Sequence, residues 1–296
     1  MNRVELLLRT PAVSLCRFDH PPAAEHHDPD FEVAPEDSIN FVEAGSFDIR
    51  LAGERFRFAP GSIFVTRRDM GFACDHDSAT PSDRCLSVAF SALAVEDLLR
   101  ADLPALTPPL ATVTPRQSFL RHRLRGCAPG EELRLELLAG ALFESLAGAG
   151  SRADRPPRRA RPAPASDRIT PRMRRIERAL ELIESDYARP LTLAEIAAAA
   201  CLSPFHFART FRELTGAPPH RHLTAVRLGH AARRLDQGAS VTDACYDVGF
   251  GSLSHFITAF HRRFGVPPSA VRRGARLTAL RAALRSPAKR APRAGG

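Results

Sequence analysis

The chain is poor in large aromatic residues other than phenylalanine. Its 296 residues include no tryptophan and two tyrosines, so the 18 phenylalanines must supply most of the bulky side chains of any core. Long apolar runs are also missing, and a membrane-spanning helix needs roughly 18 such residues in succession. The first ten residues hold only a run of three leucines, which is too short for the core of a signal peptide. We therefore expect a cytoplasmic protein with no membrane partner.

Cysteine is sparse, and its six positions are scattered between residues 16 and 245. This spacing excludes a small secreted domain that depends on a dense set of disulfides. One cluster, of Cys74, His76 and Cys85, combines residue types that bind zinc, although its spacing matches no standard zinc pattern. The alternatives are a redox pair of Cys74 and Cys85, which requires Cα atoms within about 7 Å, and a buried Cys85 beside a solvent-facing His76. The last alternative is favoured, so no cofactor is required, and a metal ion is only a candidate ligand.

Charge is divided unequally between the two halves of the chain. Residues 151–296 hold 27 of the 42 lysines and arginines but 11 of the 33 acidic residues, a net charge of +16. Residues 1–150 hold the remaining charges and have a net charge of −7. A basic half joined to an acidic half indicates a polyanionic partner for the basic half, or a basic tail that serves solubility. Composition alone leaves both interpretations open.

The acidic half has the pattern of a β-domain. Between residues 38 and 61, three segments of eight residues each end in glycine, and apolar residues alternate with charged ones, as in the segment 47–51. Period-two alternation with regularly spaced turns predicts a β-meander in a barrel or sandwich. The meander continues to residue 66, and residues 85–90 have the composition of a further strand.

Helical periodicity follows the strands. Residues 93–99 predict a short helix, and leucines at helical spacing predict an amphipathic helix over residues 131–147. The second helix either covers the β-domain or forms the seam of a homodimer, and we expect the seam. Residues 148–168 are rich in proline and arginine and predict a linker. Residues 276–296 form a basic tail without a packing pattern, which we expect to be disordered.

The basic half contains an internal repeat. Residues 206–216 and 255–265 align at an offset of 49, with matching phenylalanines, and a small apolar residue and two prolines follow each copy. Before the first copy, residues 192–195 form a capping box, and residues 240–243 before the second are closely related to one. Ser203 and Ser252 are the expected N-caps of the helices that carry the repeat. A long helix over about 219–237 is predicted between the two copies.

Each copy therefore predicts a helix, a tight turn and a second helix, which is the arrangement of a helix-turn-helix. Phenylalanines four residues apart, such as Phe207 and Phe211, place one face of the second helix against the first. The opposite face is then free to enter a major groove. The helix between the copies spans about 30 Å, close to the roughly 34 Å between successive major grooves on one side of B-DNA.

Residues 171–273 resemble the DNA-binding domain of the AraC/XylS family of bacterial transcription regulators. The resemblance is carried by LTLAEIAAAACLSPFHFARTFRELTGAPPHRHL and VTDACYDVGFGSLSHFITAFHRRFGVPPSAVR. It implies sequence-specific binding to double-stranded DNA in the nucleoid, with RNA polymerase as a further candidate partner. The N-terminal half resembles the cupin-like sensor domains of that family. This second resemblance implies a β-barrel that binds an unidentified small-molecule effector or mediates dimerisation.

The resemblance also implies which side chains meet DNA. In the first unit these are Ser203, Pro204, Phe205, Ala208, Arg209 and Arg212, and in the second Ser252, Leu253, Ser254, Ile257, Thr258 and His261. The family commonly has a basic residue at the position of Thr258, so the first unit is the expected source of strong base contacts. The alternative for Arg209 is a solvated charge on the helix surface, and for Arg212 a contact to phosphate or to solvent.

Together these observations predict an α+β protein of two domains. The domains are a cupin-like β-barrel with flanking helices over 1–147 and, after the linker 148–168, an all-α domain over 169–275 with two helix-turn-helix units joined by a long helix. The expected function is transcription regulation, not catalysis, under the control of a small-molecule, redox or metal signal. The first alternative is a cupin-type metalloenzyme fused to a DNA-binding module, although residues 39–66 contain no histidine. The second is a DNA-repair methyl acceptor, which needs a four-cysteine zinc site that this spacing lacks.

Overall fold

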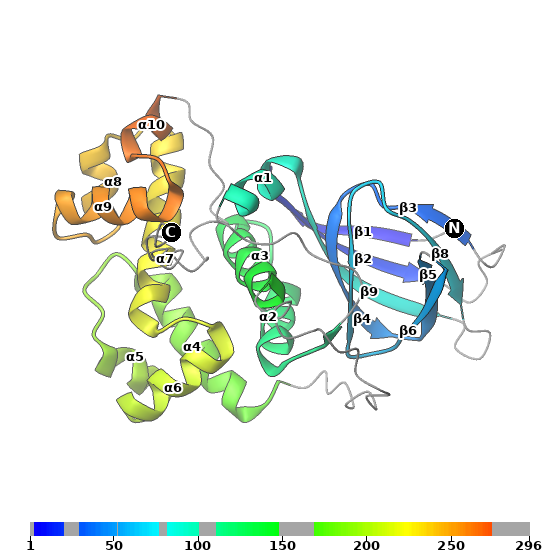
Figure 1. Ribbon diagram of the computed structural model, residues 1–296. Helices are drawn as coiled ribbons and strands as arrows, with labels where there is room; N and C mark the ends of the chain where they lie inside the picture. Colours follow the sequence, from blue (N-terminus) through cyan, green and yellow to red (C-terminus); the bar gives the residue numbers. More distant parts are fainter. Residues whose placement is uncertain are drawn as a thin grey trace, which may run out of the picture.

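The computed structural model describes residues 3–20, 30–51, 53–76, 82–100, 111–147 and 169–273. The expected linker over 148–168 and the expected tail over 276–296 lie outside these residues. The described chain is α+β, with a β-rich N-terminal region and a helical C-terminal region (Figure 1). The expected fold class is confirmed at this level.

The described strands form two antiparallel sheets. The six-stranded sheet has the order β1 (Arg3–Arg9), β2 (Val13–His20), β9 (Asp83–Phe90), β4 (Asp37–Ala44), β7 (Ser62–Thr66) and β10 (Ala111–Thr112). The four-stranded sheet has the order β3 (Asp30–Val33), β8 (Gly71–His76), β5 (Phe47–Leu51) and β6 (Glu54–Phe58). The strands expected over 39–66 and 85–90 are therefore confirmed as β4 to β7 and β9. The expected barrel is not found, because the described strands pair as two separate sheets.

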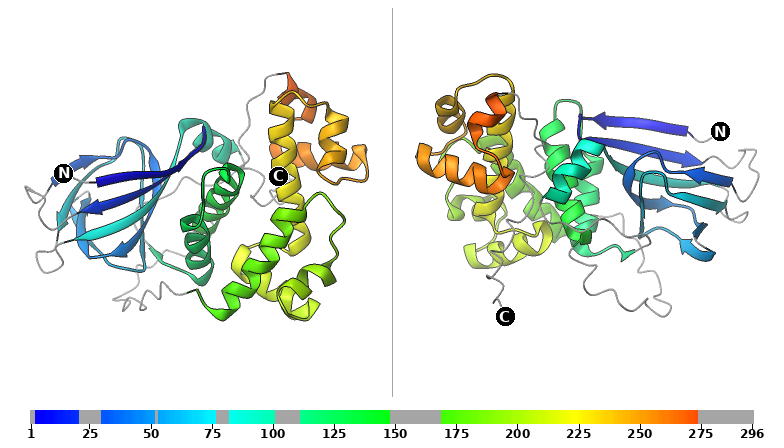
Figure 2. Two further views of the ribbon diagram at one scale, coloured as in Figure 1. Left: turned by 180° about the vertical axis from the view of Figure 1, so that it is seen from behind. Right: turned by 45° about the horizontal axis from the view of Figure 1, so that its top comes forward.

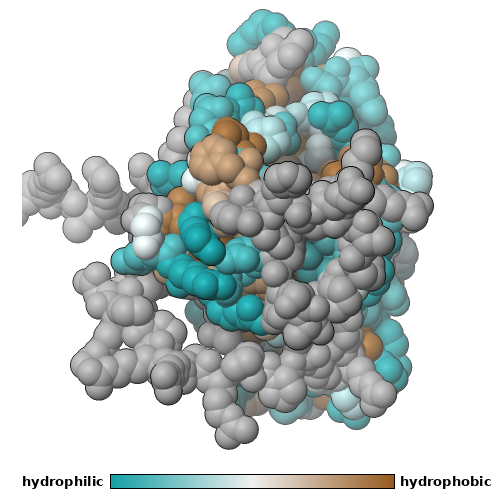
Figure 3. Space-filling model, turned by 90° about the vertical axis from the view of Figure 1, so that its right-hand side faces the viewer, coloured by the Kyte–Doolittle hydropathy of each residue, from teal (hydrophilic) through white to brown (hydrophobic). Residues whose placement is uncertain are grey.

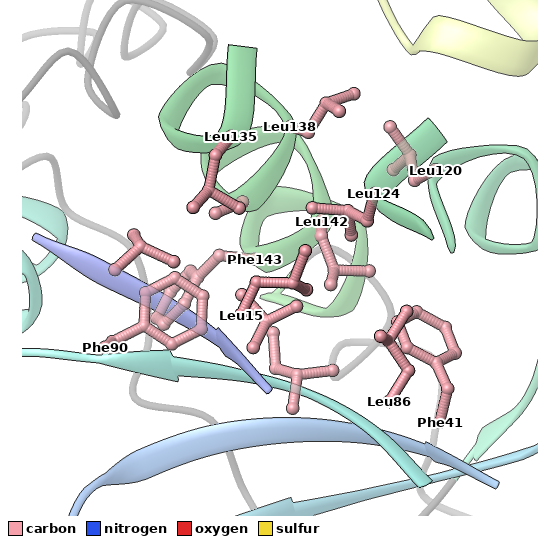
Figure 4. Close-up of a cluster of buried hydrophobic side chains, with 14 of the residues drawn as sticks. Leu15, Phe41, Leu86, Phe90, Leu120, Leu124, Leu135, Leu138, Leu142 and Phe143 are labelled. Carbon is pink, nitrogen blue, oxygen red and sulfur yellow. The ribbon is translucent and has the colours of Figure 1, made fainter. Parts of the chain in front are cut away.

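Both faces of the six-stranded sheet contribute to hydrophobic cores. One face packs against helices α2 (Pro115–Arg125) and α3 (Glu132–Ala147), and Figure 4 shows Leu135, Leu142 and Phe143 of α3 pointing toward the strands. The other face turns toward the four-stranded sheet and forms a second core with it. Successive residues of a strand alternate between these faces: Leu86 is in the helix-side core, whereas Cys85 is in the core between the sheets. A further helix, α1 (Ala92–Arg100), follows β9 directly.

Helix α3 confirms the expected amphipathic helix, but its apolar stripe is covered within the chain. Leu138 is 7% exposed and Leu142 is completely buried, and both lie in the core shared with the six-stranded sheet. Leu137, on another side of the helix, packs against the C-terminal helices. The expectation of a dimer seam along this stripe is therefore wrong, because Leu138 and Leu142, which would form the seam, are already buried within their own chain.

The C-terminal region consists of helices that lie around one long rod (Figure 2). Helices α4 (Pro171–Asp186), α5 (Leu193–Ala199) and α6 (Pro204–Thr215) pack at one end of α7 (Pro219–Asp236). Helices α8 (Val241–Asp247), α9 (Leu253–Phe264) and α10 (Pro268–Arg272) pack at its other end. The expected inward residues of the rod are all buried: Leu223, Val226, Leu228, Ala231 and Leu235. The expected long helix is confirmed, and it separates two cores.

The two regions are docked directly on each other. Phe119 of α2 is fully buried in the core that α4, α6 and α7 share. Arg123, also on α2 and only 1% exposed, donates from Nη2 to both carboxylate oxygens of Glu184 on α4, at 2.7 Å each. Removing one partner of a buried ion pair lowers the stability of the fold by several kcal/mol. The N-terminal helices are thus part of the packing of the C-terminal region.

Candidate nucleic-acid interface and internal cavity

The first helix pair, α5 and α6, is fixed by local interactions. Thr192 and Glu195 form the expected capping box at the start of α5: the Thr192 N–H donates to Oε2 of Glu195 at 2.8 Å, and the Glu195 N–H donates to the Thr192 hydroxyl at 3.2 Å. Hydrogen bonds from the Thr192 N–H and hydroxyl and from the Arg189 guanidinium lower the pKa of Glu195 to about 2. The turn to α6 passes through Cys201, whose φ of 51° is left-handed. Ser203 stands at the N-cap position of α6, but its side chain makes no capping hydrogen bond.

Helix α6 has one buried face and one exposed face. Phe207, Phe211 and Leu214 are buried against α4, α5 and α7. The residues expected to meet DNA are on the outside: Ser203, Pro204, Phe205, Arg209 and Arg212 are exposed, and Ala208 is half-buried. Phe205 is 85% exposed.

Helix α9 repeats this division. Phe256, Phe260 and Phe264 are buried against α7 and α8. Outside lie Ser252, Ser254, Ile257, Thr258 and His261, which are exposed, and Leu253, which is half-buried. Ser252 is the N-cap and accepts a hydrogen bond from the His255 N–H at 3.4 Å. The Thr258 hydroxyl donates to the Ser254 carbonyl at 2.9 Å.

The turn between α8 and α9 touches the end of α4. Gly249 has a φ of 87°, and a Cβ built on it would lie 2.2 Å from the carbonyl oxygen of Ala188. Nearby, Arg227 on α7 donates to the carbonyl oxygens of Tyr187 and Arg189, at 2.7 and 2.9 Å. These carbonyls follow the C-terminus of α4, where the helix itself offers no donors. The rod, the second helix pair and α4 are therefore joined at one point.

Arg209, on the exposed face of α6, is paired within its own helix. Arg209 donates from Nε to Oε1 of Glu213 at 3.2 Å, and its side chain is 75% exposed. Glu213 also forms an ion pair with Arg172 at the start of α4. Exposed pairs of this kind contribute less than about 1 kcal/mol. Arg209 is held weakly enough to move, and Glu213 and Arg172 are neighbours that the sequence pattern did not reveal.

The two sheets enclose a cavity of about 480 Å³. Its walls are mostly apolar, with Phe18, Phe47, Ile49, Phe64 and Phe72 among them. Its rim carries Val4, Leu6 and Val33, which are more than half exposed. Figure 3 shows hydrophobic side chains among hydrophilic ones on the surface at this end of the molecule. A mostly apolar cavity of this size is typical of small-molecule sites.

A polar strip crosses the wall that the six-stranded sheet provides. Ser38 and Thr66 hydroxyls lie 2.6 Å apart, and the Asn40 amide nitrogen donates to the Ser38 hydroxyl at 2.8 Å. Farther along the wall, Nδ1 of His20 lies 3.8 Å from the Asp83 carboxylate. The cavity thus offers a few hydrogen-bonding groups within an apolar surface, and the sequence pattern predicted neither the cavity nor this strip.

The candidate metal or redox residues lie at the same cavity. Cys74 on β8 and Cys85 on β9 are both buried and line it from opposite sheets. Burial is the main cause that raises the pKa of Cys85 well above its ordinary value. His76 on β8 lies opposite Phe47 on the neighbouring strand β5, and the side chain of His76 lies outside what the structure describes. No group of three or more His, Cys, Asp and Glu side chains that could hold a metal ion occurs in the described ranges. The burial of Cys85 agrees with the favoured alternative, in which Cys85 is a buried residue of the β-domain.

Among the described helices, none is both long and apolar enough to cross a membrane.

Comparison with known proteins places the resemblance in the C-terminal region. Residues 196–274 match a family model described as a helix-turn-helix domain. The HTH-type transcriptional activator RhaS of Klebsiella pneumoniae is 36% identical over 103 residues, which are 34% of this chain and 36% of that protein. A putative AraC-like transcription regulator of Streptomyces lividans is 36% identical over 96 residues, which are 32% of each chain.

Among solved structures, a probable AraC family transcriptional regulator from Rhodopseudomonas palustris is 31% identical, with a TM-score of 0.33. That alignment covers 35% of this chain and 99% of the other. The chain spans about a third of the length of the two curated relatives. The matched part covers α5 to α10 almost completely. The C-terminal region is therefore a helix-turn-helix domain similar to those of AraC-family transcriptional regulators.

Proposed function

We propose that the chain regulates transcription by binding double-stranded DNA through two helix-turn-helix units, α5–α6 and α8–α9. The observation that carries this proposal is the shared division of α6 and α9: each buries its phenylalanines against its partner helices and exposes the opposite face. The length of α7 adds support, since its 18 residues span about 27 Å. That length is close to the distance between successive major grooves on one side of the duplex.

The contacts of the first unit follow from the exposed face of α6. Arg209 leaves Glu213 and donates to a base, because a guanidinium can form two parallel hydrogen bonds to guanine. Arg212 reaches the phosphate backbone. The proposed contact residues in the first unit are Ser203, Pro204, Phe205, Ala208, Arg209 and Arg212.

The second unit has less charge on its reading face. The proposed contact residues there are Ser252, Leu253, Ser254, Ile257, Thr258 and His261. Ile257 and Thr258 offer methyl groups that can touch thymine. The second unit therefore contributes apolar and backbone contacts, and the first contributes most of the base discrimination.

The N-terminal region is proposed as a cupin-like sensor that binds a small-molecule effector between its sheets. The cavity volume and its few polar groups support a mainly apolar effector that carries one or two hydrogen-bonding groups. The direct docking of α2 and α3 on the C-terminal helices gives such a signal a rigid route. The proposed domains are 1–147, 148–168 as linker, 169–275 and 276–296 as tail, with RNA polymerase and a second copy of the chain as further partners.

The test uses the full chain. Genome-wide footprinting of the purified protein identifies its binding sites, and titrations on one site at several salt concentrations follow. The logarithm of affinity should fall linearly with the logarithm of salt concentration, by about 0.9 for each phosphate neutralised. Absence of salt-sensitive, site-selective binding would refute the proposal.

Arg209→Ala tests the base contact. It should weaken binding by on the order of 1–3 kcal/mol and relax the preference at one or two base pairs. Arg17→Ala is the matched control, because it removes an arginine that pairs with Glu5 on the six-stranded sheet, and it should leave binding unchanged. Equal weakening of Arg209→Ala on every DNA sequence would show that Arg209 contacts phosphate alone.

A further inference from the structure

A second, smaller cavity lies where the N-terminal helices dock on the C-terminal region. Its volume is about 60 Å³. Helices α2 and α3 line one side of it, and α4, α7, α9 and the C-terminal end of α6 line the other. Because about 10–15 Å³ is enough for one water, this space has room for about four to six waters or for one small ion.

The walls of this junction cavity carry an excess of positive charge. Among its described lining residues are the guanidinium groups of Arg123, Arg134, Arg221 and Arg263, and the only carboxylate is that of Glu184. Arg123 pairs with Glu184 through two contacts of 2.7 Å, and Nη1 of Arg134 donates to Oε1 of Glu131 at 2.6 Å, so two carboxylates face four guanidinium groups. Burial lowers the pKa of Arg263 to about 10, so the side chain is still charged near neutral pH. Charges brought together in a low-dielectric space repel strongly unless a counter-charge is present.

Several nitrogens at this cavity are buried without a hydrogen-bond partner in the described part of the chain. They are Nε of Arg123, Nε of Arg134, Nη1 of Arg263 and Nε2 of His222. Arg123 itself is 1% exposed. An arginine nitrogen cannot lose its proton in a protein, so each of the three arginine nitrogens is an N–H donor that needs an acceptor. Buried donors without acceptors cost about 1–3 kcal/mol each, and more when charged.

We propose that the junction cavity binds one small oxyanion of the size of phosphate or sulfate. The planar fork of an arginine matches the oxygens of such an anion. A single tetrahedral anion has enough acceptor oxygens for all the buried donors and supplies the missing negative charge. The small volume suits an inorganic oxyanion better than an organic effector. This site is separate from the cavity between the sheets.

The position of the site gives the anion a structural role. Arg123 and Arg134 come from the N-terminal helices, and Arg263 comes from the last turn of α9. The backbone from Thr215 to Ala217, at the end of α6, lines the same space. An anion bound here holds the C-terminal ends of both α6 and α9 against α2 and α3. It therefore fixes the spacing of the two helices whose outer faces are exposed.

The experiment is isothermal titration calorimetry of the full chain with sodium phosphate, with sodium chloride at matched ionic strength as the reference. We expect one saturable phosphate site. Arg134→Gln and Arg263→Gln, which act from different helices, should each weaken it at least tenfold. Arg262→Gln is the matched control, because Arg262 is the exposed neighbour of Arg263, and its affinity should stay within about twofold of the parent. Circular dichroism checks that each variant is folded.

Glu184→Gln provides a test that loss of folding cannot imitate. It removes the only carboxylate among the described lining residues and frees Arg123, so phosphate should bind several-fold more tightly. Any one of four outcomes would overturn the proposal. They are the absence of saturable phosphate binding, unchanged binding in both arginine variants, an equal loss of binding in Arg262→Gln, and weaker binding in folded Glu184→Gln. None of these measurements uses DNA, so their outcome is independent of the proposed function.

Discussion

We expect Gly249→Ala to damage the second helix pair through a steric overlap that no rotation relieves. A Cβ at this position would lie 2.2 Å from the carbonyl oxygen of Ala188 and 2.8 Å from its carbonyl carbon. Both atoms belong to the backbone that follows α4. Gly238, just after α7, has nearly the same left-handed φ, 94°, but no atom lies within 4 Å of its added Cβ. The two glycines therefore separate the cost of the overlap from the cost of backbone conformation.

The geometry allows the two costs to be assigned. A left-handed backbone costs a non-glycine residue about 1–2 kcal/mol, so Gly238→Ala should lower the free energy of unfolding by that amount. Gly249→Ala carries the same cost together with that of overpacking, which is typically about 1–3 kcal/mol. Its total is about 2–5 kcal/mol. Because whole domains are stable by only about 5–15 kcal/mol, this is a large fraction of the available stability.

Urea unfolding of the full chain, followed by far-ultraviolet circular dichroism, measures both variants against the parent. The expected result is a larger loss for Gly249→Ala than for Gly238→Ala, by about 1–3 kcal/mol. Equal losses would mean that the segment around Ala188 moves away at no cost. In that case the close contact of Gly249 with the backbone after α4 would not hold the second helix pair in place.

Three other changes test the packing and the electrostatics. Phe211→Ala should lower the free energy of unfolding by about 3–5 kcal/mol in the same assay, because the ring is fully buried, and a variant of unchanged stability would contradict the assigned faces of α6. Leu142→Lys should unfold or aggregate in sedimentation experiments, since it buries a charge against the six-stranded sheet; a soluble, folded monomer would contradict this packing. The pKa of Glu195 is lowered from 4.5 to about 2, so its stabilising effect is complete above about pH 4.5 and is lost as the pH falls toward 2. Glu195→Gln, which does not titrate, should therefore flatten the stability curve in that window of pH, and an unchanged acid-side slope would count against the capping box.

The sequence predicted those parts of the molecule that depend on neighbours in the chain. The capping box of Thr192 and Glu195 and the paired phenylalanines of α6 and α9 were readable because their spacing follows from helix geometry. The meander over 39–66 was readable for the same reason, since turns and alternation are local features. The exposed faces of α6 and α9 then followed from their buried faces.

The candidate site was predicted less completely. The pattern selected Arg209 but not Glu213 and Arg172, because a charge on a helix surface carries no mark of its partner. It selected Cys74 and Cys85 as a pair but did not reveal that they line a cavity from two different sheets. It also assigned the stripe of α3 to a dimer, because an apolar stripe looks the same whether its own chain or another covers it.

By itself, the sequence determined the fold class, the two helix pairs and the faces that they expose, since each rests on interactions between residues a few positions apart. Only the tertiary structure decided which surface covers α3, where the cavities lie and how the two regions meet. Those features depend on residues far apart in the chain, as Arg123 and Glu184 are, separated by 61 positions. Their pairing has no periodic signal, because it arises from the packing of whole elements and not from the spacing of residues within one of them.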